Sequence, residues 1–127
     1  MAKIEHFALF AADPGALKDF YVAALGLRVA VDNSGATPPG YFLADDHGMA
    51  LEIIGRPAGV PGADTRYICH VAFVVEDFAP AKAALEKVGM VFETDSVVDN
   101  ATMTTAFFRD PEGNRVQIVR RPAPLLG

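Results

Sequence analysis

The chain has 127 residues, a formal net charge of −5 at pH 7 and a hydrophobic fraction of 51%. This length suffices for one domain with a buried core, and the acidic balance argues against a nucleic-acid partner or an anionic membrane surface. The single cysteine excludes an internal disulfide framework. No apolar run reaches the length of a membrane span, and the first residues lack the pattern of a signal peptide. We therefore expect a cytoplasmic protein with no nucleic-acid or membrane partner.

The first half of the chain predicts one strand, one helix and three further strands. Residues 3–11 form the first strand, and Asp13 followed by Pro14 caps and opens a helix that ends at Gly26. Apolar residues recur through this helix at the spacing of one buried face, namely Leu17, Phe20, Tyr21, Ala24 and Leu25. The three further strands are expected near residues 28–32, 41–44 and 49–54.

The second half repeats this order of elements after a linker rich in glycine and proline, residues 55–66. Its predicted elements are a strand at 67–75, a helix at 78–88, and strands near 91–95, 102–109 and 115–121. The buried face of this helix is predicted to contain Phe78, Ala81, Leu85 and Val88. We therefore predict a single α+β domain of two βαβββ modules, residues 3–54 and 67–121, with mostly antiparallel sheets.

The two modules also match in sequence. "IEHFALFAAD" (4–13) corresponds to "ICHVAFVVED" (68–77), "LGLRV" (25–29) to "VGMVF" (88–92), and "HGMALEII" (47–54) to "EGNRVQIV" (112–119). The offset between the halves stays at 63 to 65 residues across these three pairs. Such a constant offset indicates a tandem duplication.

The repeat places four polar residues of apolar strands at equivalent positions, His6 with His70 and Glu52 with Gln117. A carboxylate in the middle of "ALEII" is costly unless it is paired, hydrogen-bonded or bound to a cation. Two imidazoles, a carboxylate and an amide oxygen are suitable ligands for a divalent metal. The sequence therefore predicts a metal site made of these four residues.

A simpler interpretation exists for each residue taken alone. A strand histidine is more often a core or interface residue than a ligand, and a strand Glu or Gln often lies on a solvated face of an antiparallel sheet. The equivalence of the four positions under the repeat favours the metal site over four unrelated polar residues.

The two modules resemble the vicinal oxygen chelate superfamily, which includes glyoxalase I, methylmalonyl-CoA epimerase, extradiol dioxygenases, and fosfomycin and bleomycin resistance proteins. The resemblance runs from "IEHFALFAADPGALKDFYVAALGL" to "FFRDPEGNRVQIV". It implies that each module curls its sheet into an open cup and that a metal ion sits where two cups meet. It also implies ligands from the first and last strands of each module, which are His6, Glu52, His70 and Gln117. The ion could be zinc, nickel, manganese, cobalt or iron.

The leading functional hypothesis is a metal-dependent isomerase or lyase of the glyoxalase kind. Its substrate would be a small molecule with adjacent oxygens, such as a 2-hydroxy ketone, a hemithioacetal or a 2-oxo acid derivative, processed through an enediolate-type intermediate. In many members of the superfamily the residue matching Gln117 is a glutamate that binds metal and moves protons. An amide cannot act as a base, so Glu52 is the predicted catalytic group.

Two other classes of function stay open. Two histidines and one carboxylate could hold iron(II) in an extradiol-type dioxygenase. A metal-free protein of the bleomycin-resistance kind could instead bind a small molecule between the cups.

Each half supplies only two of the four candidate ligands. A complete site therefore needs a first-half cup facing a second-half cup, within one chain or between two. Exposed apolar surface and strand edges on an open cup favour association. We expect a homodimer in which His6 and Glu52 of one chain meet His70 and Gln117 of the other.

Overall fold

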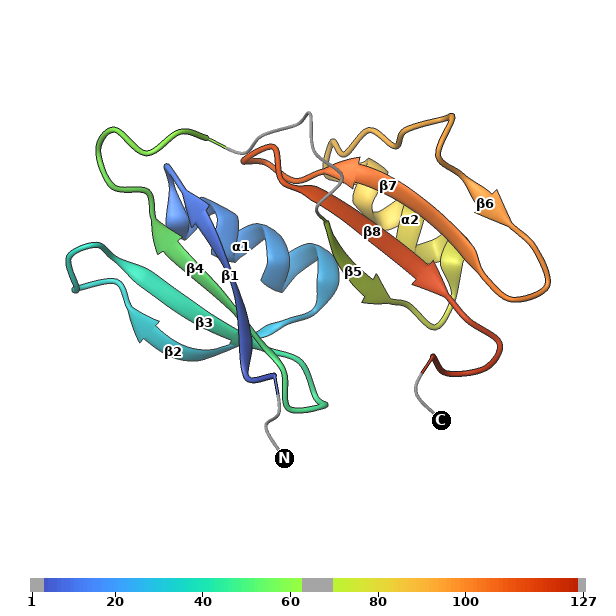
Figure 1. The fold of residues 1–127 in the computed structure, drawn as a ribbon, viewed down its shortest axis with the longest axis horizontal. Helices are drawn as coiled ribbons and strands as arrows, with labels where there is room; N and C mark the ends of the chain where they lie inside the picture. Colours follow the sequence, from blue (N-terminus) through green and yellow to red (C-terminus); the bar gives the residue numbers. More distant parts are fainter. Residues whose placement is uncertain (1–3, 63–69, 126–127) are drawn as a thin grey trace. The chain divides into compact units, whose positions relative to one another are not determined.

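The computed structural model describes residues 4–62 and 70–125. The chain divides into two compact units, Met1–Asp64 and Thr65–Gly127, which are called the first and second half below (Figure 1). The predicted first residues of the second module, 67–69, and part of the predicted linker lie outside the described residues. Within the described ranges, neither helix has the length and apolar character that a membrane span requires.

The first half is a four-stranded sheet with one helix. Its elements are β1 (His6–Ala11), α1 (Pro14–Leu25), β2 (Arg28–Asn33), β3 (Gly40–Ala44) and β4 (Ala50–Gly55). The strand order is β1-β4-β3-β2, with β1 parallel to β4 and the other two pairs antiparallel.

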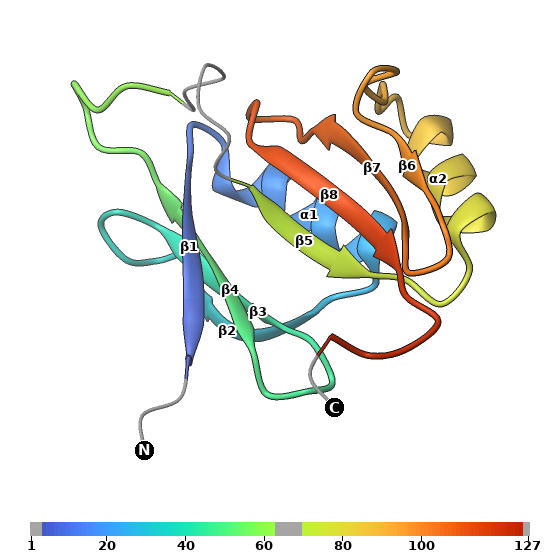
Figure 2. The same cartoon turned by 45° about the vertical axis from the view of Figure 1, so that its right-hand side comes forward.

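The second half has the same plan. Its elements are β5 (Val71–Val74), α2 (Phe78–Lys87), β6 (Val98–Asp99), β7 (Thr104–Arg109) and β8 (Arg115–Arg120). The strand order is β5-β8-β7-β6, again with one parallel pair, β5 with β8, and two antiparallel pairs. Figures 1 and 2 show the helix of each half against its own sheet. The predicted α+β fold of two modules with mostly antiparallel sheets is confirmed.

The core of each half lies between its helix and one face of its sheet. In the first half, α1 packs on β3 and β4, and its Leu17 and Tyr21 are fully buried together with Leu43 and Ile53 of the sheet. In the second half, α2 packs on β8, where Leu85 and Ile118 are fully buried. Burial of one large apolar side chain contributes about 1.5–3 kcal/mol. Because side chains alternate along a strand, every second residue points to the other face of the sheet, which is called the open face below.

The ends of α1 follow the predicted signals. The Oδ1 atom of Asp13 accepts a hydrogen bond from the Ala16 amide at 3.0 Å, and Pro14 occupies the first turn, where its missing N–H costs nothing. Gly26 ends the helix with φ 73, a left-handed conformation that glycine adopts without a Cβ penalty. Asp13 and Gly26 thus fix the position of α1 along the sheet.

The predicted strand 91–95 is wrong. In this region Phe92 makes an isolated antiparallel bridge to Phe108, and regular pairing begins only at β6. The chain bends over residues 94–96, Thr-Asp-Ser, whose short polar side chains favour turns. Val88 was also expected in a buried helical face, but it is 51% exposed because α2 ends at Lys87.

An aspartate closes the last hairpin of each half in the same way. In the second half, Oδ1 of Asp110 accepts hydrogen bonds from the amides of Glu112 and Asn114, both at 2.9 Å, and Oδ2 accepts one from the Asn114 side chain at 2.8 Å. Gly113 completes the turn with φ 86. This turn sets the register in which Phe107 lies opposite Gln117.

The first half repeats the turn with fewer bonds. Oδ1 of Asp45 accepts from the amides of His47 at 2.8 Å and Met49 at 3.1 Å, and Gly48 has φ 91. The resulting register places Phe42 opposite Glu52. The two turns therefore set the register of the last strand of each half, β4 and β8.

We predict that Asp110→Ala destabilises the protein by about 2–3 kcal/mol, because a buried acceptor of three hydrogen bonds is lost and its donors lose their partner. Asp45→Ala, which removes two bonds from a less buried turn, should cost only about 1 kcal/mol. Urea unfolding of the two variants measures both values. Equal losses of unfolding free energy in the two variants would show that the extra bond to Asn114 and the burial of Asp110 add no stability.

Candidate functional site

His6 and Glu52 meet on the open face of the first half. The parallel pairing of β1 with β4 sets Ala8 opposite Glu52, and His6 lies two residues before Ala8 on the same face. Nε2 of His6 is 3.7 Å from Oε1 of Glu52, with the two side chains 37% and 20% exposed. On the other side of the ring, Nδ1 of His6 is 2.9 Å from Oε1 of Glu5.

This geometry fits a metal ion. Two ligand atoms bound tetrahedrally at ordinary zinc distances lie about 3.4 Å from each other, which is close to the observed 3.7 Å between His6 Nε2 and Glu52 Oε1. Glu5 occupies the position of an outer carboxylate that accepts the second ring N–H of a ligating histidine. Nε2 of His6 and Oε1 of Glu52 would therefore bind the ion, while Nδ1 on the opposite edge of the ring faces Glu5.

The second half builds the same arrangement. In the first half the His6 ring contacts Phe42 edge-on, with centroids 5.4 Å apart and planes at 89°. In the second half the His70 ring contacts Phe107 at 5.0 Å and 86°, and Phe107 is the residue opposite Gln117. Each half thus carries a histidine in edge contact with the phenylalanine that lies opposite its Glu or Gln.

The structure brings His6 and Glu52 together, and it places His70 against Phe107, the residue opposite Gln117. Across residues 4–62 and 70–125, no three His, Cys, Asp or Glu side chains gather as a metal-binding group. Convergence of His6, Glu52, His70 and Gln117 on one centre stays a prediction.

Gln117 is held by a hydrogen-bond chain that the sequence did not suggest. Its Nε2 donates to Oγ1 of Thr105, and the Thr105 hydroxyl donates to the Ile118 carbonyl oxygen at 3.0 Å. Thr105 is only 1% exposed. Its role was missed because a threonine in a strand is common, and its partner is defined only by the β7–β8 register.

Arg115 was also missed. It lies on the open face two residues before Gln117, and its Nε and Nη2 donate to Oε2 of Glu93 at 3.1 and 3.0 Å. Its guanidinium carbon is 3.8 Å from the centroid of the Phe107 ring, a stacked cation–π contact. Because side chains alternate along a strand, the spacing of two residues between Arg115 and Gln117 could have placed Arg115 on the same face. Its remaining N–H groups are able to bind an anionic oxygen.

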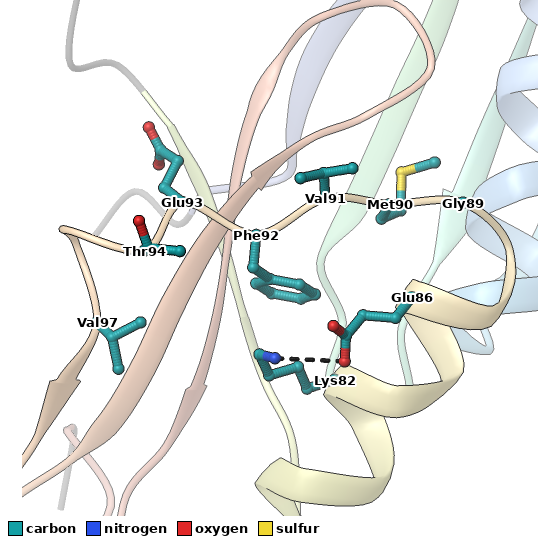
Figure 3. Close-up of a pocket in the computed structure, with 9 residues that line it drawn as sticks. All are labelled: Lys82, Glu86, Gly89, Met90, Val91, Phe92, Glu93, Thr94 and Val97. Atoms are coloured by element: carbon teal, nitrogen blue, oxygen red, sulfur yellow. Dashed lines mark ion pairs between the residues drawn. The ribbon is translucent and has the colours of Figure 1, made fainter.

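A pocket of about 540 Å³ lies elsewhere in the second half, at the C-terminal end of α2. Figure 3 shows the Phe92 ring beside an ion pair of 3.3 Å between Lys82 and Glu86, with Val91 at its rim. None of the four candidate ligands lines it. The pocket is therefore distinct from the four candidate ligands, and Glu93, the partner of Arg115, lies in its lining.

Comparisons with solved structures show the fold. A glyoxalase/dioxygenase from Nostoc punctiforme has 22% identity and a TM-score of 0.78, covering 95% of this chain and 92% of that one. TnmS3, an antibiotic binding protein from Streptomyces sp. CB03234, has 20% identity and a TM-score of 0.75, with 95% and 97% covered. The oxidase ChaP-H2 has 22% identity and a TM-score of 0.74, with 99% and 98% covered.

No curated protein sequence matches the chain. The sequence model of one family does match, over residues 3–118. Since this match spans both βαβββ modules, the protein belongs to the Glyoxalase/Bleomycin resistance protein/Dioxygenase superfamily.

Proposed function

We propose that the protein is a metal-dependent isomerase or lyase that acts on a small molecule with adjacent oxygens. The observation that supports this most strongly is the pair on the open face of the first half, in which His6 Nε2 and Glu52 Oε1 face each other at 3.7 Å. The second half offers His70 and the amide of Gln117 at the equivalent positions. Together these atoms are a ligand set for one divalent cation.

The chemistry divides between the cation and Glu52. A divalent cation at this site would supply Lewis acidity, which lowers the cost of removing a proton next to a carbonyl group. Glu52 lies between the apolar neighbours Ala8 and Phe42 in the ladder and is 20% exposed. Its carboxylate is the one group of the four that is able to act as a general base for that proton.

The ligand set also favours an anionic substrate. One carboxylate, one amide and two neutral imidazoles sum to a charge of −1, so a divalent cation bound to them leaves a net +1. Arg115 lies on the same face as Gln117, where the Glu93 carboxylate at 3.0 Å offsets its charge and its remaining N–H groups are able to donate to an anionic oxygen. A substrate that carries a carboxylate, such as a 2-oxo acid derivative, complements the net charge of the metal site and these N–H donors.

Two alternatives have support among the structural neighbours. ChaP-H2 is named an oxidase and TnmS3 an antibiotic binding protein, on the same fold as this chain. A dioxygenase would require iron and consume oxygen, whereas a binding protein would retain an unchanged ligand. Oxygen uptake and product analysis separate both from an isomerase or lyase.

We also propose a homodimer in which the two halves of the site come from different chains. Each half carries two of the four ligands, and apolar side chains such as Phe10 and Val74 are exposed on the edge strands β1 and β5. Exposed strand edges and apolar side chains favour pairing with another chain.

Metal binding is tested with the protein purified without added metal. We expect elemental analysis to find one divalent ion per site, and His6→Ala or His70→Ala to weaken metal affinity at least ~10-fold, because each removes a ligand. His47→Ala is the matched control, since His47 is the third histidine and lies in an exposed turn. Equal affinity in all three variants would refute the metal site.

Proton transfer is tested at Glu52. Glu52→Gln should lose most turnover, at least ~100-fold, because it removes the only carboxylate of the four while keeping an oxygen ligand. Gln117→Glu should retain turnover but weaken binding of an anionic substrate, since the added carboxylate cancels the net positive charge of the site. Steady-state kinetics of both variants measure kcat and KM. Full activity in Glu52→Gln would place the base elsewhere.

The shared site is tested by mixing His6→Ala with His70→Ala chains. A mixed dimer with shared sites contains one site in which all four ligands are intact, so random mixing should restore about a quarter of the wild-type metal sites. If both pairs belong to one chain, mixing restores none. Sedimentation of the wild type as a monomer at micromolar concentration would also contradict this arrangement.

A further inference from the structure

The buried Thr105 hydroxyl determines which end of the Gln117 amide is available for binding. The hydroxyl donates its one proton to the Ile118 carbonyl oxygen at 3.0 Å, and a carbonyl oxygen can only accept. Toward Gln117 the hydroxyl can therefore only accept, so it is the Nε2 end of the amide that faces it. The Oε1 end of Gln117 is left for another partner.

The first half lacks this device. The register pairs Thr105 with Val119 in the second half and Gly40 with Ile54 in the first, which makes Gly40 the counterpart of Thr105 under the repeat. A Cβ added at Gly40 would lie 2.8 Å from the Ile53 carbonyl oxygen, closer than real Cβ atoms approach. No hydroxyl can therefore be placed beside Glu52 from this position.

The two halves thus differ both in the candidate ligand and in the residue beside it. The half with the hydroxyl carries an amide, and the half with glycine carries a carboxylate. Both oxygens of a carboxylate are acceptors, so a carboxylate needs no such orientation, whereas an amide presents an oxygen only when its nitrogen is held elsewhere. This difference gives the hydroxyl a role that core packing alone does not explain.

We propose that Thr105 is a positioning residue that presents Oε1 of Gln117 as a neutral oxygen ligand of the divalent cation. The proposal rests on the metal site of the proposed function and adds a residue to it. A neutral ligand held in this way preserves the −1 charge of the ligand set and hence its preference for an anionic substrate.

The experiment deletes or retains the hydroxyl. Thr105→Val removes it at nearly constant volume, Thr105→Ala removes it without adding a methyl group, and Thr105→Ser retains it. Thr104→Val is the matched control, because Thr104 is the neighbouring residue and its hydroxyl bonds Asp99 Oδ1 at 3.0 Å instead.

Two measurements are made on each variant. In the metal-free protein, NMR of the Gln117 side-chain amide should show a hydrogen-bonded, slowly exchanging N–H in wild type, Thr105→Ser and Thr104→Val, and its loss in Thr105→Val and Thr105→Ala. Titration with zinc should show an affinity about 10-fold weaker in the two variants without the hydroxyl and unchanged in the other two.

Both quantities must change together for the proposal to hold. A Gln117 amide signal that is the same in Thr105→Ala and wild type overturns it, and so does an altered amide signal with unchanged zinc affinity. Wild-type protein that binds neither zinc nor any of the other candidate ions (nickel, manganese, cobalt and iron) refutes the proposed function itself. That result is distinguishable, because the amide signal of the metal-free protein still reports whether Thr105 holds Gln117.

Discussion

The register of the last hairpin in each half controls every other feature of the candidate site. Side chains alternate along β4 and β8, so a slip of one residue would turn Glu52 and Gln117 toward the helix and bring Ile53 and Ile118 to the open face. Such a slip would bury a carboxylate and expose two large apolar side chains, both of which are costly. The aspartate turns at the hairpin tips and the apolar residues under the helices enforce the same register. Fold stability and ligand placement therefore depend on one constraint.

Duplication kept this scaffold and let the chemistry of the two halves diverge. The contacts of His6 with Phe42 and of His70 with Phe107 have nearly the same geometry, so the backbone and the aromatic ring are common to both halves. What differs is charge. The first half holds two carboxylates near its histidine, Glu5 and Glu52, whereas the second half holds an amide and the ion pair of Arg115 with Glu93, whose charges offset each other. The carboxylates beside the histidine are thus confined to the first half.

Local signals in the sequence predicted the fold because each acts on its own neighbours. Asp13 and Gly26 bound α1 through contacts within a few residues, and the repeat revealed the second module from the first. The prediction of a strand at 91–95 was wrong because the chain bends at residues 94–96, in spite of the apolar residues before the bend. Thr105 and Arg115 could not be assigned from the sequence, since their partners Gln117, Glu93 and Phe107 come from other segments and depend on register. Whether the two ligand pairs converge depends on packing between modules, which no local pattern encodes.

The energetics of the open face argue that its polar residues are present for function. A contact of 3.7 Å between the partly exposed side chains of His6 and Glu52 contributes only ~0–1 kcal/mol. Apolar residues at these positions would pack against Phe42 and Ala8 without the cost of desolvating a carboxylate. Proteins retain such unfavourable residues where activity requires them, at some cost in stability. The second half places polar residues, His70 and Gln117, at the equivalent positions and adds a buried hydroxyl that orients the amide. A fold that gains little stability from these groups has kept all of them on one face of each sheet, which is the expected result if they bind a common ligand.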